Sequence, residues 1–298
     1  PGPPIALPNM YRVARRVPLA RKAGTRGFAT EKELRDRLGT IKNISKVTKA
    51  MNMVAAAKLR KHQDALGASK SFSKGVDGLM FEADSDKPTM VVPFSTDKGL
   101  CGGVNTFVNR EAKKQMSDLG ENYTLFTYGV KSKSNLQRVF GSKLVGGIVD
   151  CTGGNPVTFA EACEVAAFLG EQDAGNMKVI YNSFVNMITY DTLVLDIPSA
   201  QAFAAEADKK FEAYEEEGDE GGVMTSFYEF ILACKIFGII NECQTCEQSS
   251  RMTAMDTSSS NADEMYDKLL LQANRVRQAK ITKELMEIVG GASAIQDG

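Results

Sequence analysis

The sequence predicts an α-rich α+β fold, in which a long antiparallel coiled coil of N- and C-terminal helices carries an inserted small α/β domain. Narrow seams with coiled-coil spacing occur near both ends of the 298-residue chain. A seam this narrow packs on one other helix rather than on a globular core. Between the two seams, strand and helix patterns alternate, which is typical of a domain with a mostly parallel sheet.

The N-terminal helix is expected over residues 31–66, with Thr30 as its N-cap and Glu33 at the capping-box position. Four apolar residues follow one line along this helix, at spacings of three and four: Ile44, Val47, Met51 and Val54. Lysine and arginine side chains flank this line. We therefore expect the line itself to pack on the C-terminal helix.

The C-terminal helix is expected within residues 206–298, with an interruption near 218–222. Its seam steps by three and four without a break: Met252, Met255, Ser259, Ala262, Tyr266, Leu269, Ala273 and Val276. Two such seams at opposite ends of one chain predict an antiparallel pair, with Met51 and Arg251 at similar height. Thr30 should then lie near residue 272.

Beyond residue 272 the C-terminal helix is expected to have no partner within this chain. Five apolar residues lie in that stretch: Ile281, Leu285, Met286, Ile288 and Val289. Exposed apolar side chains that gather in one place mark an interface with another protein. We therefore expect these five side chains to be exposed in the isolated chain.

Residues 88–200 change from a helical to a strand period. Five strands are expected, at 89–96, 123–129, 144–150, 177–184 and 187–197, with helices between them at 104–119, 130–140 and 158–171. This alternation predicts a small Rossmann-like sheet whose last two strands form an antiparallel hairpin at one edge. Residues 67–87 are interpreted as a connector that contains a weak helix.

Composition excludes several classes of function. The net charge is −1, so no overall field attracts nucleic acid or a membrane surface. No apolar run approaches the roughly 18 residues of a membrane-spanning helix, so we expect no direct membrane insertion. The only histidine, His62, excludes a multi-histidine metal site and is expected on the solvated face of its helix.

The first 30 residues differ from the rest, because they contain six lysines or arginines and no acid. Such leaders resemble mitochondrial transit peptides. A disordered basic arm that stays on the protein is the alternative.

The six cysteines are scattered through apolar or small-residue surroundings, which suits a reducing compartment.

Two short motifs suggest chemistry but fail on spacing. GLCGG at 99–103 matches neither GxGxxG nor the phosphate-binding P-loop, so its glycines are interpreted as a sharp strand-to-helix turn. Asp97, just before it, has no evident partner base. Cys243 and Cys246 lie inside a helical run and lack the second ligand pair of a zinc site, so we interpret them as packed or surface thiols. The sequence indicates no catalytic residues, no cofactor and no metal.

Five blocks, in order and at fitting spacing, carry a family resemblance over residues 31–295. They are KNISKVTKAMNMVAAAKLRK (42–61), STDKGLCGGVN (95–105), YNSFVNMITYDTLVLDIPS (181–199), EQSSRMTAMDTSSSNADEMYDKL (247–269) and NRVRQAKITKELMEIVGGASA (274–294). The chain resembles the γ subunit of the F-type ATP synthase. Its basic leader, and the lack of the extra segment typical of chloroplast γ subunits, make it similar to mitochondrial members.

The resemblance implies a non-catalytic rotor that transmits torque between a proton-driven membrane ring and a catalytic αβ ring. Implied partners are the α and β subunits, the small rotor subunits at the foot and the membrane ring, on the matrix side of the mitochondrial inner membrane. Implied rotor–stator contacts are Met51, Arg251, Arg277, Gln278 and Thr282. The five apolar residues beyond residue 272 would form a bearing.

On the residues alone, two other functions remain open. An unrelated coiled-coil adaptor would purify without α and β partners. A small-molecule enzyme would have a ligand-lined pocket at the carboxyl ends of its strands. Asn52, where many relatives carry a charge, and residues 296–298, beyond the usual apolar ending, depart from the family pattern.

Overall fold

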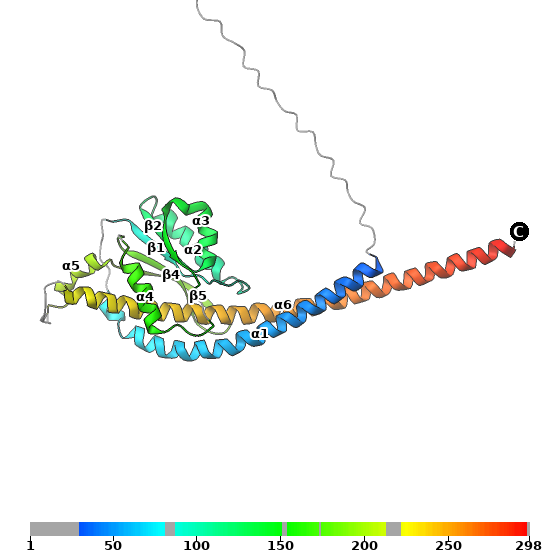
Figure 1. Ribbon diagram of the computed structural model, residues 1–298, viewed down its shortest axis with the longest axis horizontal. Coiled ribbons are helices and arrows are strands. Elements are labelled where there is room, and N and C mark those ends of the chain that lie inside the picture. Colours follow the sequence, from blue (N-terminus) through cyan, green and yellow to red (C-terminus); the bar gives the residue numbers. More distant parts are fainter. Residues whose placement is uncertain (1–29, 81–86, 151–153, 173, 213–221, 297–298) are drawn as a thin grey trace, which may run out of the picture. The chain divides into compact units, whose positions relative to one another are not determined.

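The computed structural model describes residues 30–80, 87–150, 154–172, 174–212 and 222–296. Apart from Thr30, the expected basic leader lies outside the described residues. The chain divides into two compact units, one of residues 39–268 and one of residues 1–38 with 269–298. Two long helices contribute to both units (Figure 1): α1 (Glu31–Lys74) and α6 (Gly222–Gln296).

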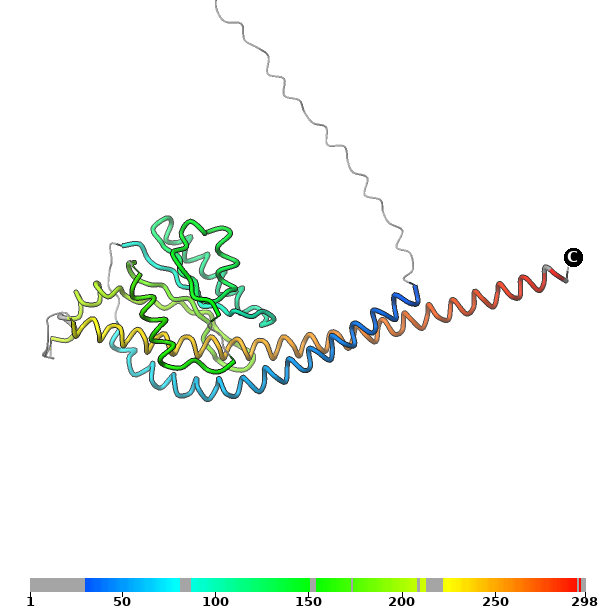
Figure 2. The backbone as a smooth tube through the Cα atoms, viewed as in Figure 1, coloured from blue at the N-terminus to red at the C-terminus, as the bar shows by residue number. Residues whose placement is uncertain are grey.

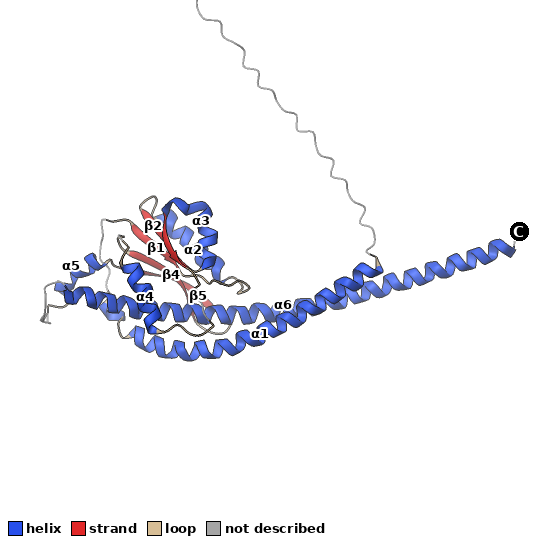
Figure 3. Cartoon of the chain, in the orientation of Figure 1, coloured by secondary structure: helices blue, strands red, loops and turns tan. Residues whose placement is uncertain are grey.

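A sheet lies within the larger unit (Figure 3). It has five strands in the order β3-β2-β1-β4-β5. Its strands are β1 (Thr89–Pro93), β2 (Tyr123–Tyr128), β3 (Leu144–Ile148), β4 (Met177–Phe184) and β5 (Tyr190–Ile197). The first four are parallel, and β5 pairs antiparallel with β4 at one edge. The predicted α/β domain and its edge hairpin are therefore confirmed.

Helices cover both faces of this sheet. On one face lie α2 (Val104–Asp118) and α3 (Val130–Phe140), which share a core with Val91. On the other face lie α4 (Phe159–Gly170), α5 (Ala200–Lys210) and the first half of α6, which share a core with Val92. Neighbouring strand residues reach opposite cores because side chains alternate along a strand. Two short 3₁₀ turns complete the elements, η1 (Asp77–Leu79) and η2 (Gly141–Lys143).

Helix α6 is more apolar than we expected from the sequence. It contains an 18-residue window of mean hydropathy 1.7, which is long and apolar enough to cross a membrane by length and composition, and 56% of that window is buried inside the protein. The expectation that no such stretch exists is therefore corrected. Ile231, Leu232, Ile236 and Ile240 supply much of this hydropathy, and they are buried in the core beneath the sheet.

Helix α1 starts with the predicted cap but runs past the predicted end. The Thr30 N–H donates to Glu33 Oε2 (3.0 Å), and the Glu33 N–H donates to Thr30 Oγ1 (3.4 Å). The helix ends at Lys74 instead of residue 66. Contacts with α6 hold this last part: Lys70 forms an ion pair with Glu242 (3.1 Å), and a side chain at Gly238 would meet Ser73 Oγ at 2.8 Å.

The side of α1 that is buried differs from the predicted one. Val47 and Val54 are 58% and 57% exposed, whereas Ala55 and Leu59 are 1% and 2% exposed. Buried or half-buried residues recur along a different line, at spacings of three and four: Leu34, Leu38, Ile41, Ser45, Thr48, Asn52, Ala55, Leu59, His62, Leu66 and Ser69. The predicted line Ile44–Val47–Met51–Val54 therefore lies beside the true seam, and only Met51 is half-buried.

Hydrogen bonds explain why polar residues occupy this seam. Ser45 Oγ donates to Asp263 (2.7 Å), and Asn52 Nδ2 donates to the Met252 carbonyl (2.9 Å). Small side chains let the two helices lie close together, and each buried polar group that makes such a bond avoids the cost of desolvation. An apolar pattern alone cannot detect a seam of this kind.

The same bonds fix the direction of the pair. Residues 45–52 of α1 and 252–263 of α6 run antiparallel in the larger unit (Figure 2), as predicted, and Met51 lies level with Arg251. The predicted seam of α6 is buried or half-buried along its whole length. In the smaller unit Glu31 lies 3.8 Å from Lys280, so the overlap reaches beyond residue 272.

His62 is buried in the seam and not solvated as expected. Its residue is 1% exposed, and among the described residues neither ring nitrogen meets the distance and angle criteria of a hydrogen bond. Burial lowers the pKa of the imidazole, and the positive charge of Lys58 lowers it further, while the nearby Gln244 side chain opposes them. The expectation was wrong because it placed the seam one position away along the helix.

We predict that Leu59→Ala destabilises the chain far more than Val54→Ala. Truncation of a buried leucine costs about 2–5 kcal/mol, whereas a surface change usually stays within about 0.5 kcal/mol. Urea and thermal unfolding of both variants measure the difference. A larger loss for Val54→Ala would show that the apolar line, and not the observed seam, packs on α6.

We also predict that lowering the pH reduces the free energy of unfolding of the chain, because His62 becomes protonated more readily in the unfolded state. Because the folded pKa lies below the ordinary value of about 6.5, the folded chain binds fewer protons than the unfolded chain as the pH falls below that value. The contribution of neutral His62 is thus complete above about pH 6.5 and is lost at lower pH.

Melting temperatures between about pH 7 and pH 5 test this prediction on the parent chain and on His62→Gln, because unperturbed carboxyl groups titrate mostly below that range. The parent should lose stability more steeply than the variant. Both chains contain Glu247, whose raised pKa would act in the opposite direction, so its effect cancels in the comparison. Parallel curves would exclude His62 as the cause.

Candidate functional site

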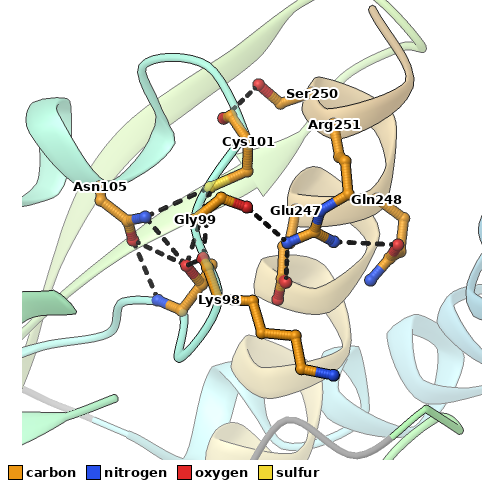
Figure 4. A network of polar contacts seen from close by, with 9 residues as sticks. Lys98, Gly99, Cys101, Asn105, Glu247, Gln248, Ser250 and Arg251 are labelled. Atoms are coloured by element: carbon orange, nitrogen blue, oxygen red, sulfur yellow. Dashed lines mark hydrogen bonds and ion pairs between the residues drawn. The ribbon is translucent and has the colours of Figure 1, made fainter. Parts of the chain in front are cut away.

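The turn between β1 and α2 is attached to α6 by two side chains that are adjacent in the sequence (Figure 4). Ser250 Oγ donates to the Cys101 carbonyl (2.7 Å), and Arg251 Nη2 donates to the Gly99 carbonyl (3.3 Å). These bonds join the α/β domain to the helix pair at the level of Met51. We call residues 95–103 the β1–α2 turn.

Arg251 is held by α6 itself as well as by the turn. Its guanidinium donates to Glu247 Oε1 (2.5 Å) and to Gln248 Oε1 (3.1 Å). Both charged residues of this ion pair are buried, at 2% exposure for Glu247 and 9% for Arg251. Burial raises the pKa of the Glu247 carboxyl, and the attraction of Arg251 only partly offsets this effect.

The interior of the turn is also bonded within the chain. Asn105 accepts from the Thr96 N–H (3.0 Å) and donates to Thr96 Oγ1 (2.9 Å) and to Cys101 Sγ (3.2 Å). Asp97, which had no evident role in the sequence, accepts from the Val130 N–H (3.0 Å) at the start of α3. The turn is therefore bonded to α2, to α3 and to α6.

The backbone of the turn adopts two left-handed conformations, at Leu100 (φ 61°) and Gly102 (φ 59°). Glycine accepts this conformation freely, whereas leucine does so at a cost. A side chain at Gly102 would also lie 2.7 Å from Ser250 Oγ. The glycines of GLCGG thus serve a sharp turn, as interpreted, and the close approach to α6. The Leu100 side chain is 62% exposed.

A surface hollow of about 360 Å³ lies beside this network. It is lined by Val47, Ala50, Met51, Val54, Ala55, Lys58, Lys98, Gln248 and Arg251. The lining is mainly apolar, and the two lysines add positive charge. This chemistry suits a partner surface that carries both apolar and acidic side chains.

The chemistry available at the sheet depends on the β1–α2 turn and on the two cysteines of α6. In an open α/β sheet a ligand binds at the carboxyl ends of the strands, and the β1–α2 turn occupies that place after β1 with its polar groups bonded internally. Within the described ranges, no cluster of His, Cys, Asp and Glu could hold a metal ion. Cys243 and Cys246 are buried, and burial raises the pKa of the Cys243 thiol to about 12, which disfavours the nucleophilic thiolate.

The remaining predicted site residues lie on the last part of α6, in the smaller unit. Arg277, Gln278 and Thr282 are exposed, and Thr282 Oγ1 donates to the Gln278 carbonyl (2.9 Å). The five apolar residues beyond them are exposed by 54–70%, as expected: Ile281, Leu285, Met286, Ile288 and Val289.

Sequence reasoning missed the contribution of Glu247 and Ser250 to the site, and that of Lys98. Glu247 and Ser250 lie in the block EQSSR, whereas Lys98 lies in STDKG, about 150 residues earlier in the chain. Nothing in a single sequence indicates that these blocks touch.

We predict that Gly102→Ala destabilises the chain more than Gly120→Ala. Both glycines have positive φ, but a side chain at Gly120 would meet no atom of the described residues within 4 Å, so the matched variant isolates the backbone strain. The backbone strain costs about 1 kcal/mol in either variant, and the contact with Ser250 should add to it in Gly102→Ala. Thermal unfolding measures the loss of stability in both variants. Equal losses would contradict the close approach of the turn to α6.

Comparison with known proteins places these features in a family. The family described as ATP synthase matches residues 30–295. The mitochondrial ATP synthase γ subunit of Drosophila melanogaster is 36% identical over 96% of this chain and 99% of its own length. The rat mitochondrial γ subunit and the γ chain of Phenylobacterium zucineum are each 36% identical to this chain. Each match covers 90% of this chain and the full length of the relative.

Solved structures agree with the sequence comparison. A chain from the central stalk and c-ring structure of the Tetrahymena thermophila mitochondrial ATP synthase matches with a TM-score of 0.60 and 27% identity, over 72% of this chain and 99% of that one. A chain of the Euglena gracilis enzyme has the same fold, with a TM-score of 0.75 at 17% identity, over 91% of this chain and 96% of that one. The chain therefore belongs to the γ-subunit family of the ATP synthases.

Proposed function

We propose that this chain is the rotor of the central stalk in a mitochondrial ATP synthase. It transmits torque between the proton-driven ring of the membrane and the catalytic ring of α and β subunits. The antiparallel pairing of α1 with α6 carries this proposal, because two helices with interlocked side chains resist twisting better than one. Membership of the γ-subunit family supports it and disfavours an unrelated adaptor.

The chain works on the matrix side of the inner membrane, attached to it only through the complex. The mitochondrial relatives support this location. Its apolar α6 stretch is largely used within its own core. Small rotor subunits and the membrane ring are its further partners.

The chain itself is non-catalytic, and the catalytic sites lie on the β subunits. The β1–α2 turn supports this, because it lies where a ligand would bind in such a sheet. Its polar groups form hydrogen bonds with one another and with α6 instead. The chain thus serves as a mechanical element and holds no nucleotide.

Two regions contact the αβ ring. Met51 and Arg251 act at the hollow that they share, where lysines and apolar side chains suit an acidic and apolar partner. Arg277, Gln278 and Thr282 present exposed polar groups on α6, and a planar guanidinium suits a carboxylate or carbonyl on the partner. The five exposed apolar residues from Ile281 to Val289 form the bearing, since a second protein must cover them.

Assembly of the purified chain with α and β subunits tests the proposed function. The complex should hydrolyse ATP and rotate a bead attached through Val139→Cys, which is an exposed position on α3. A complex of α and β subunits alone is the control. If the chain neither assembles with these subunits nor rotates, the rotor proposal is wrong.

We predict that Arg277→Ala and Gln278→Ala impair the complex without weakening the chain. A hydrogen bond to a charged group contributes about 1.5–3 kcal/mol, so loss of the Arg277 contact should lower coupled turnover by about tenfold or more. The melting temperature of the isolated chain should barely change, because both residues are exposed. Lys283→Ala, an exposed neighbour on α6, is the control. A large fall in melting temperature with normal turnover would contradict the assignment.

A further inference from the structure

We propose that Glu247, Ser250 and Arg251 are positioning residues that hold the β1–α2 turn in one conformation on α6. Through this contact the α/β domain moves together with the helix pair at the level of Met51. The mechanical consequence rests on the proposed rotor function, whereas the positioning itself concerns this chain alone.

The geometry at the turn carries the inference. Ser250 and Arg251 bind the carbonyls of Cys101 and Gly99, and Leu100 lies between these two acceptors in a left-handed conformation. A leucine keeps such a conformation only where its surroundings impose it. Two donors on one turn of a rigid helix are such surroundings. Figure 4 shows both donors reaching the turn from the same side.

The charged pair is better suited to positioning than to stability. A buried ion pair contributes little net stability, because desolvation of both charges offsets their attraction. Arginine, however, has several donors in a rigid fork, and Arg251 uses them for Glu247, Gln248 and Gly99 together. Glu247 thus fixes the guanidinium, and the guanidinium fixes the turn.

This arrangement determines which groups the turn offers to a partner. With both carbonyls held against α6, the Leu100 side chain is exposed and Lys98 lines the hollow beside Met51. Release of the turn would move both groups. Arg251 would then affect the rotor contact through the turn, in addition to its own place in the hollow.

The double variant Glu247→Gln/Arg251→Gln tests the inference in the full chain. It removes both charges together, so no lone buried charge remains to unfold the protein. The matched control is Glu264→Gln/Lys268→Gln, which removes an exposed pair with the same spacing on the same helix (3.5 Å). Ser250→Ala is a second, milder variant that removes the bond to Cys101 and leaves the charged pair in place.

The first measurement is the rate at which N-ethylmaleimide alkylates each cysteine, followed by peptide mass spectrometry. Cys101 is buried in the turn, and Cys234 is buried in the core beneath the sheet. Release of the turn should speed alkylation of Cys101 by about tenfold or more in the double variant, and by less in Ser250→Ala, while Cys234 stays protected. Unchanged Cys101 rates in both variants, or equal acceleration of Cys234, would overturn the inference.

The second measurement is the coupling of ATP hydrolysis to proton transport in the reconstituted enzyme. Ser250→Ala, which leaves the proposed ring contact Arg251 in place, should assemble and hydrolyse ATP but transport fewer protons per ATP than the parent and the control variant. Normal coupling with a released turn would overturn the mechanical part of the inference. A parent chain that supports no coupled transport would instead refute the proposed function, and the alkylation result would still stand.

Discussion

The close approach of α1 and α6 is the constraint on which the rest of the larger unit depends. Serine, threonine and alanine in the seam allow this approach, and Gly238 allows it again beside Ser73. Once the helices lie this close, their remaining faces are directed away from each other. One face of α6 then forms the floor beneath the sheet, and the outer face of α1 is left for solvent or a partner.

Polar contacts make this packing specific. An apolar seam tolerates a shift of one turn, whereas Ser45 with Asp263 and Asn52 with the Met252 carbonyl fit only one register. The same principle holds at the β1–α2 turn, where Ser250 and Arg251 each bind a particular carbonyl. Buried polar groups of this kind add little net free energy, but every alternative arrangement leaves them unpaired, which is costly.

The apolar residues that the seam does not use have a consequence for binding. Ile44, Val47 and Val54 are exposed on α1, and a larger set of apolar side chains is exposed near the end of α6. Lysines flank both sets, and the apolar area between them is available to a partner. These features suit a rotor that must contact a surrounding ring without locking into it permanently.

The sequence by itself determined the architecture: the α/β domain with its edge hairpin, the cap of α1, the C-terminal seam and the antiparallel pairing. These follow from periodicity and local hydrogen bonding, which act over a few residues. The five blocks also identified the family. Met51 and Arg251 were correctly placed at one level, because heptad geometry relates positions along two paired helices.

Only the tertiary structure decided which face of α1 is buried, because small and polar residues that bond across the pair leave no apolar signal. Because the wrong face of α1 was predicted to be buried, His62 was expected at the surface, whereas it lies in the interior. The extension of α1 to Lys74 likewise depends on Glu242 and Gly238, which are far away in the sequence. The network of Glu247, Ser250 and Arg251 with the β1–α2 turn joins residues about 150 positions apart. No local pattern encodes such a contact, since it exists only after the sheet has packed on α6.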